Sequence, residues 1–177
     1  MSIDPGTCTF RPFRADDLPL LHRWVNATHA KRWFGNGRTT GDLSSEYLPY
    51  IRGEVPIRVF VVLYEELPIG MVEWEHMVDF PDFARAYGVT EPGVANCDIL
   101  IGDPAFVGRG LGASLVTKFL REIVFADPRI HTCVLDPEPD NRAAIRAYEK
   151  AGFVHVRDLD DDGQGNAVYL MELRRSP

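Results

Sequence analysis

The residues with the clearest potential for chemistry form a glycine-rich loop, Gly108-Arg109-Gly110-Leu111-Gly112. Glycines let backbone N–H groups approach a ligand closely, and the helix expected after the loop adds the positive end of its dipole. A pyrophosphate therefore suits this loop. Its spacing fits neither the dinucleotide pattern GxGxxG nor the P-loop pattern GxxxxGK(S/T). A tight turn that uses glycine for packing is the alternative interpretation.

Two aspartates could accept a proton from an amine or hold an ammonium group. Asp98 is a polar residue in the otherwise apolar run 94–101, and strand alternation places it on the opposite face from its neighbours. Asp136 follows the expected strand 131–135, at the edge where open α/β sheets present ligands. Structural alternatives exist for both, because Asp98 could satisfy a backbone N–H group and Asp-Pro is frequent turn chemistry.

Acidic and aromatic side chains elsewhere could contact a cationic acceptor. Glu73 and Glu75 alternate with Trp74, so both carboxylates point to one face of their strand, which either lines a cleft or faces solvent. Trp33 and Phe34 either form an aromatic wall for a cation or a sugar ring, or belong to the core.

The composition of the 177 residues limits the partners. A net charge of −7 argues against nucleic acid and anionic lipid and suits a cationic ligand. Without a long apolar run or a signal peptide, the sequence predicts a cytoplasmic protein with no membrane partner, either a monomer or a homodimer. The histidines and cysteines lack ligand spacing, so no metal is expected. The length suits one domain over residues 1–177.

The elements that must position these residues follow from periodicity and turn signals. Strands are expected at 7–12, 57–64, 94–101 and 131–135, with a hairpin strand that ends at Glu75 and two strands after residue 153. Helices are expected at 27–34, 42–52, 111–125 and 141–150, and from Asp16 or Asp17 through Val25. Segment 78–93, which contains two prolines, is expected to be a long surface loop.

A second motif follows the glycine loop by about thirty residues: Asn141-Arg-Ala-Ala-Ile-Arg-Ala-Tyr148-Glu-Lys-Ala-Gly152-Phe153. Together the two motifs resemble the GNAT superfamily of N-acetyltransferases, whose loop reads Q/R-x-x-G-x-G/A and whose later helix reads N-x-x-A-x-x-x-Y-x-K-x-G-F. The match departs at Val107, which stands at the Gln/Arg position. The resemblance implies an α/β fold: a central mixed, mostly antiparallel, twisted sheet of about seven strands, flanked by helices, with strands splayed at the cofactor site.

The same resemblance implies acetyl-coenzyme A as cosubstrate and assigns its contacts. The pyrophosphate would be held by Val107, Gly108, Arg109, Gly110, Leu111 and Gly112. The pantetheine arm would pair with the main chain of Ile99, Leu100 and Ile101 and bond to Asn141. Tyr148 would contact the cofactor and protonate the departing thiolate; an ordinary core tyrosine is the alternative.

Several short stretches resemble the integron-borne aminoglycoside 6'-N-acetyltransferases more narrowly. They are His29-Ala-Lys-Arg-Trp33-Phe34-Gly35, Glu46-Tyr47-Leu48-Pro49, Pro68-Ile69-Gly70, Glu91-Pro92-Gly93-Val94 with Asp98, and Asp136-Pro137-Glu138-Pro139-Asp140-Asn141. That family also carries a small apolar residue where Val107 stands. The resemblance implies acetyl transfer to the 6'-amine of an aminoglycoside, a small cationic acceptor, as a resistance activity.

In this interpretation Asp98 and Tyr148 are catalytic, with Asp98 removing the proton directly or through water. Substrate contacts are expected from Trp33, Glu73, Asp98 and Asp136. A related branch acylates hydroxylated lysine in siderophore assembly, and a protein N-terminal amine is another possible acceptor. A non-catalytic domain that senses coenzyme A is an alternative from another class.

Overall fold

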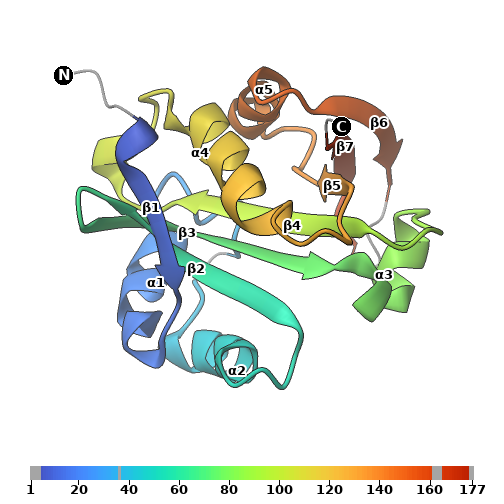
Figure 1. Cartoon of the computed structure of the whole chain (residues 1–177). Helices are drawn as coiled ribbons and strands as arrows, with labels where there is room; N and C mark the ends of the chain where they lie inside the picture. Colours follow the sequence, from blue (N-terminus) through green and yellow to red (C-terminus); the bar gives the residue numbers. More distant parts are fainter. Residues whose placement is uncertain (1–4, 36, 161–164, 176–177) are drawn as a thin grey trace. The chain divides into compact units, whose positions relative to one another are not determined.

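The computed structural model describes residues 5–35, 37–160 and 165–175 (Figure 1). The strands are β1 (Cys8–Pro12), β2 (Ile57–Tyr64), β3 (Leu67–His76), β4 (Val94–Ile101), β5 (Thr132–Leu135), β6 (Val154–Leu159) and β7 (Val168–Arg174). The helices are α1 (Leu18–Val25), α2 (Thr40–Ile51), α3 (Pro81–Ala86), α4 (Leu111–Phe119) and α5 (Arg142–Lys150), and a π-helical turn, Leu120–Val124, extends α4.

The strands form one sheet in the order β1-β2-β3-β4-β5-β7-β6. The pairs β1–β2, β5–β7 and β6–β7 are antiparallel, whereas β4 and β5 are parallel. This is the mixed, mostly antiparallel sheet of seven strands that the sequence resemblance implies. The ladder between β4 and β5 joins Val94 to Thr132 and ends at the pair Asn96 and Val134. Because β4 runs on to Ile101, its last residues extend beyond that ladder.

Internal contacts divide the chain into two compact units, and each is described by itself. Unit 1 comprises Met1–Glu73 and Asp98–Leu111; unit 2 comprises Trp74–Cys97 and Gly112–Pro177. Each unit contains a buried apolar cluster. One domain over residues 1–177 stays a prediction.

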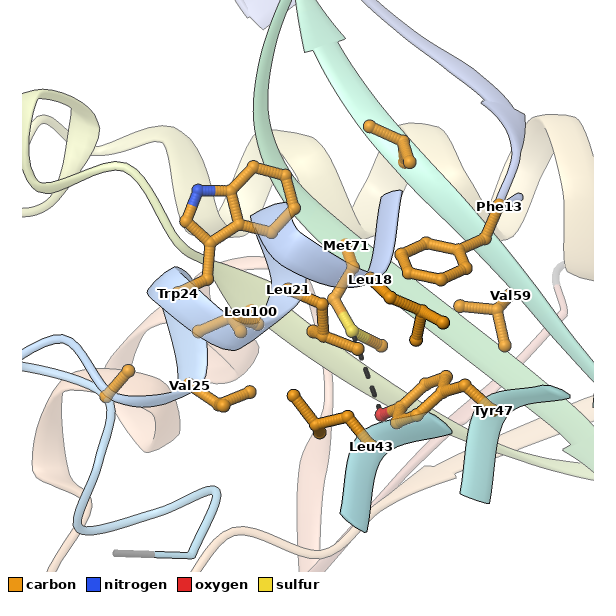
Figure 2. Packing of buried hydrophobic residues seen from close by; sticks show 12 residues of the cluster. Phe13, Leu18, Leu21, Trp24, Val25, Leu43, Tyr47, Val59, Met71 and Leu100 are labelled. Carbon is orange, nitrogen blue, oxygen red and sulfur yellow. Dashed lines mark hydrogen bonds between the residues drawn. The ribbon is translucent and has the colours of Figure 1, made fainter. Parts of the chain in front are cut away.

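The core of unit 1 lies where α1 and α2 meet strand residues (Figure 2). The apolar face expected for α1 is confirmed, because Leu18, Leu21, Trp24 and Val25 are all buried. They share one cluster with Leu43 and Tyr47 of α2, Val59 and Val61 of β2, Met71 of β3 and Leu100 of β4. This packing holds the end of β4 against the two helices of the unit.

Unit 2 holds α3, α4 from Gly112 onward, α5 and the last three strands. Gly112 packs closely on α5, because a Cβ added there would lie 3.1 Å from the Cβ of Ala147. Gly152 then ends α5 in a left-handed conformation with a φ of 97°. The beginning of α4 and the motif helix α5 are thus neighbours within this unit.

Two expectations about local structure are wrong. Segment 27–34 forms successive turns rather than a helix, and its bonds include Ala30 N to Ala27 O and Trp33 N to Ala30 O. Bonds of the i to i−4 type also occur, from Lys31 N to Ala27 O and from Phe34 N to Ala30 O, but they do not continue into a helix. The His29 side chain contacts the distant Ile101 carbonyl oxygen.

The segment expected to be a loop, 78–93, contains helix α3. Pro81 occupies the first turn of this helix, where its missing N–H group costs nothing. Ala84 and the following Tyr87 are buried with Met77, so the segment has an apolar face that the prolines concealed.

Candidate active site

The glycine loop begins at the exposed Val107 and leads directly into α4. Gly108 and Gly110 adopt φ values of 72° and 80°, which L side chains rarely adopt. No heavy atom lies within 4 Å of a Cβ added at either glycine, so backbone conformation and not crowding requires them. The loop is exposed at the N-terminus of a helix, where free N–H groups suit an anion.

The end of β4 is held by several contacts within unit 1. His29 Nε2 lies 2.9 Å from the Ile101 carbonyl oxygen, and the N–H groups of Gly102 and Asp103 both donate to Ile69 O at 2.9 Å. Gly70 is needed because an added Cβ would overlap the Leu100 carbonyl oxygen. Of the main-chain groups predicted to pair with pantetheine, the Ile101 carbonyl therefore already has a partner.

Tyr47 of α2 lies among carboxylates in unit 1. Burial raises the pKa of its phenol well above the ordinary 10.0, and the negative charges of Glu73, Glu46 and Asp98 raise this pKa further, against the lowering effect of Arg38. The phenol therefore stays neutral, and its hydroxyl contacts the Met71 sulfur at 3.9 Å (Figure 2). The predicted residues Glu73 and Asp98 thus belong to one acidic region of unit 1.

Sequence reasoning gave no role to Glu46 and Tyr47; the Tyr47 phenol interacts electrostatically with Glu46 and with the predicted residues Glu73 and Asp98. The only signal was the stretch Glu46-Tyr47-Leu48-Pro49, which carried a resemblance but no chemical role. In the structure Glu46 forms an ion pair with Arg38, so one carboxylate of this region is matched by a cation. We call Glu46, Glu73, Asp98 and Tyr47 the acidic region.

The two aromatic residues of segment 27–34 have different environments. Phe34 packs against the buried cluster of unit 1, as the core interpretation requires. Trp33 is half-buried, and the guanidinium carbon of Arg32 lies 4.6 Å from its ring centroid. Arg32 thus covers one face of the Trp33 ring, so a ligand cation or sugar would use the other face or displace Arg32.

Asp136 lies in unit 2, immediately after β5, and is half-buried. The hydroxyl of Tyr87 donates to its Oδ2 at 2.6 Å. Tyr87 belongs to the segment that was expected to be a loop, so the sequence offered no reason to pair these two residues.

The residues of the second motif are also in unit 2. Asn141 caps α5, because its Oδ1 accepts from the Ala144 N–H group at 3.2 Å. Tyr148 is half-buried, with its ring centroid 6.0 Å from that of Phe153. Its exposure differs from that of a fully buried core tyrosine such as Tyr87.

Glu75 does not form a surface carboxylate. It is buried and accepts a hydrogen bond from Asn96 Nδ2 at 3.2 Å within unit 2. Glu73 is half-buried in unit 1. The solvent-facing alternative is therefore wrong for Glu75, whereas Glu73 keeps part of its surface exposed.

A small pocket of about 110 Å³ opens in unit 2 beside Tyr87, Thr132, Arg157 and Arg174. None of its lining residues is among the predicted site residues, and it is too small for a drug-sized ligand.

The part of the chain that the structure describes contains neither a cluster of metal-binding side chains nor a helix able to cross a membrane. No three or more His, Cys, Asp and Glu side chains gather as metal ligands would, and the absence of a metal stays a prediction. None of the helices in the described ranges combines the length and apolar composition that a membrane crossing requires.

Known proteins resemble this chain in one consistent way. The sequence profile of the acetyltransferase (GNAT) domain matches residues 14–161. An aminoglycoside N(6')-acetyltransferase type 1 of Klebsiella pneumoniae is 32% identical over 171 residues, which cover 95% of this chain and 84% of the relative. A kanamycin resistance protein of Rhizobium radiobacter is 39% identical over 87 residues, which cover 49% of this chain and 79% of that protein.

Solved structures agree with these relatives. The structure of aminoglycoside acetyltransferase AAC(6')-Ib in complex with coenzyme A and kanamycin is 30% identical, with a TM-score of 0.84. The match covers 95% of both chains.

Proposed function

Because this chain belongs to the GNAT acetyltransferase family, we propose that it transfers acetyl from acetyl-coenzyme A to the 6'-amine of an aminoglycoside. The proposal is carried by the 32% identity to an aminoglycoside N(6')-acetyltransferase over 95% of this chain. The acidic region of unit 1 agrees with a cationic acceptor: Glu46 is already paired with Arg38, and Glu73 and Asp98 are the carboxylates proposed to meet the acceptor.

The cosubstrate supplies an activated acetyl group as a thioester, and the glycine loop fits its pyrophosphate. Residues 107–110 of the loop are exposed just before α4, and there is open space around Gly108 and Gly110, which suits close approach of a phosphate to the backbone N–H groups. On β4, the main chain of Ile99, Leu100 and Ile101 is the proposed partner of the pantetheine arm. The Ile101 carbonyl oxygen contacts His29 Nε2 at 2.9 Å and keeps a second lone pair for another donor.

The chemistry requires proton transfers at two places. Asp98 takes a proton from the acceptor ammonium, directly or through water, so that the neutral nitrogen can form a C–N bond to the acetyl carbon. As the C–S bond breaks, the Tyr148 phenol gives its proton to the coenzyme A sulfur. The proton lost from the nitrogen after attack restores the phenol through solvent. The products are an acetamide and the free thiol of coenzyme A.

The remaining predicted residues bind the acceptor. Glu73 and Asp136 hold ammonium groups by charge-assisted contacts, and Trp33 provides an aromatic face.

The proposed place of action is the cytoplasm, with a monomer or homodimer as the acting form. The cosubstrate and the small cationic amine are the proposed partners.

The first experiment measures coenzyme A release with a matched pair of aminoglycosides. Neomycin has a 6'-amine, whereas paromomycin has a hydroxyl at that position and is otherwise the same. We expect turnover of neomycin, kanamycin and tobramycin and little turnover of paromomycin. Turnover only with hydroxylysine, spermidine or a short peptide would leave the acetyltransferase chemistry intact and discard the aminoglycoside.

The assigned base is tested by Asp98→Asn. Removing a general base lowers kcat by about 10²- to 10⁴-fold, while coenzyme A affinity and the melting temperature should stay near those of the unsubstituted protein. An Asp98→Asn protein that folds, binds cofactor and keeps full turnover would exclude Asp98 as the base. Tyr148→Phe tests the acid in the same way.

A further inference from the structure

Tyr87 makes one of the shortest side-chain contacts in unit 2, to a residue proposed to bind the acceptor. Its hydroxyl donates to Asp136 Oδ2 at 2.6 Å, across 49 positions of the chain. A phenol that donates to a carboxylate at this distance forms a charge-assisted hydrogen bond, which is stronger than a bond between neutral groups.

The Tyr87 ring is itself fixed in place. Its exposed fraction is 0%, its centroid lies 4.3 Å from that of Phe83, and Arg157 Nη2 donates to its backbone carbonyl at 3.0 Å. The ring belongs to the buried cluster of unit 2 together with Met77, Val94 and Val134. Because the donor has no rotamer freedom to lose, the bond to Asp136 can hold that carboxylate in one orientation.

The Asp136 carboxylate needs a hydrogen bond that orients it, because Asp136 lies outside the β ladder. It follows the last residue of β5 and precedes a proline, so the β ladder ends just before it. A carboxylate has two oxygens and about four lone-pair positions, so a bond to one oxygen leaves capacity for an ammonium. Holding the carboxylate in advance removes an ordering cost from acceptor binding.

We propose that Tyr87 is a positioning residue for the acceptor: it fixes the Asp136 carboxylate so that it can receive an ammonium group distant from the reacting amine. The inference rests on the proposed function, since it assigns a task to Asp136 within it. Its consequence is a preference for acceptors with several ammonium groups over those with one. Tyr87 itself touches neither substrate nor the reacting atoms.

The test is Tyr87→Phe, which keeps the buried ring and removes only the hydroxyl. We expect KM for neomycin to rise about tenfold, as the loss of a hydrogen bond to a charged group predicts, with kcat within about twofold. KM for a simple alkyl monoamine should not change. Tyr169→Phe is the matched control, because it also removes a hydroxyl in unit 2 but from a ring stacked on His155.

A double-mutant cycle separates positioning from a purely structural role. If Tyr87 acts through Asp136, then Tyr87→Phe should have no further effect on KM in an Asp136→Asn protein. An equal rise in both backgrounds, or a fall in melting temperature with no change in KM, would overturn the inference. An unchanged KM in Asp136→Asn would do the same while the acetyltransferase function stands.

Binding measurements distinguish failure of the inference about Tyr87 from failure of the proposed function. If the unsubstituted protein releases no coenzyme A with any amine, the proposed function is wrong. Calorimetry with neomycin then still decides the role of Tyr87, because Tyr87→Phe should bind about tenfold more weakly and Tyr169→Phe should bind equally well.

Discussion

Asp17 is an aspartate of unit 1 whose carboxylate has a structural role. The sequence predicts that the first helix starts at Asp16 or Asp17, and Asp17 is indeed the N-cap residue of α1. Its side chain makes no cap bond, however, and binds Arg11 through two bonds of 2.7 Å. It also accepts from the Arg14 N–H group at 2.8 Å. For Asp98 and Asp136 the proposed task is a different one, at the cationic acceptor.

The free energy of unfolding should depend on Asp17 in a pH-dependent way. Burial raises the pKa of Asp17, but the bonds from Arg11 and Arg14 outweigh it and hold the pKa below the ordinary 3.8. A depressed pKa in the folded state contributes stability that is present above about pH 4 and is lost as the pH falls through the folded value.

Asp17→Asn should therefore lower the free energy of unfolding at pH 7 by about 2 kcal/mol, because the buried bonds lose their charge. Urea denaturation between pH 7 and pH 3 measures this, and the difference from the unsubstituted protein should shrink towards low pH. Asp16→Asn is the control at an exposed neighbour. A difference that grows as the pH falls would contradict the assigned ion pair.

Among the elements, the hairpin strand β3 approaches the backbone of β4 closely at Gly70. A Cβ at this position would overlap the Leu100 carbonyl oxygen, and the Ile101 Cα would lie 3.2 Å away. Both neighbours are backbone atoms of β4, which packing and the His29 bond hold in place. The approach thus fixes the strand that carries Asp98 and the proposed pantetheine partners.

Gly70→Ala should destabilise the protein by about 2 kcal/mol or more, because overpacking against backbone cannot be relieved by a change of rotamer. Chemical denaturation measures the loss. The acetyl-coenzyme A KM should rise as well, since the displaced strand is the proposed thioester strand.

Gly41→Ala is the matched control within unit 1. Gly41 is exposed in the first turn of α2, and an added Cβ would meet only Thr39 Oγ1 at 3.6 Å. This substitution should leave stability within about 0.5 kcal/mol or raise it slightly, because alanine favours helices. If Gly70→Ala and Gly41→Ala lowered the free energy of unfolding equally, the close approach of Gly70 to β4 would have no special energetic cost.

At the scale of the whole molecule, regular elements cross from one unit to the other. The boundaries fall inside β3, between Glu73 and Trp74, and inside β4, between Cys97 and Asp98. A third boundary lies at the start of α4. Because an element cannot melt in one half without fraying the other, we expect one cooperative unfolding transition.

Calorimetry tests this expectation by comparing the calorimetric and van't Hoff enthalpies, which should agree. Hydrogen exchange read peptide by peptide should show equal protection in the buried clusters of both units. Two separate transitions, or early exchange of one whole cluster, would contradict the prediction of a single domain.

The three thiols should be inert in the folded protein. Cys8, Cys97 and Cys133 have exposed fractions of 0%, 1% and 0%, and none forms a disulfide. A disulfide-exchange reagent such as dithionitrobenzoate should therefore label no thiol in the native protein and three in guanidinium chloride. The same reagent detects coenzyme A, so native labelling of the enzyme would appear as a background in the turnover assay.

The sequence by itself determined the features that depend on neighbours along the chain. Glycines at 108 and 110 mark a left-handed turn before a helix, the apolar spacing of α1 marks its buried face, and Asn141 marks the start of α5. Each follows from spacing within one or two turns of chain. Together with the two motifs, they were enough to identify the fold class and the family.

Only the tertiary structure decided which distant residues support the site. Tyr87 reaches Asp136 across 49 positions, and His29 reaches Ile101 across 72. The acidic region around Tyr47 likewise combines residues from α2, β3 and β4. Spacing along the chain carries no signal for such contacts, because they depend on which strands and helices become neighbours after folding.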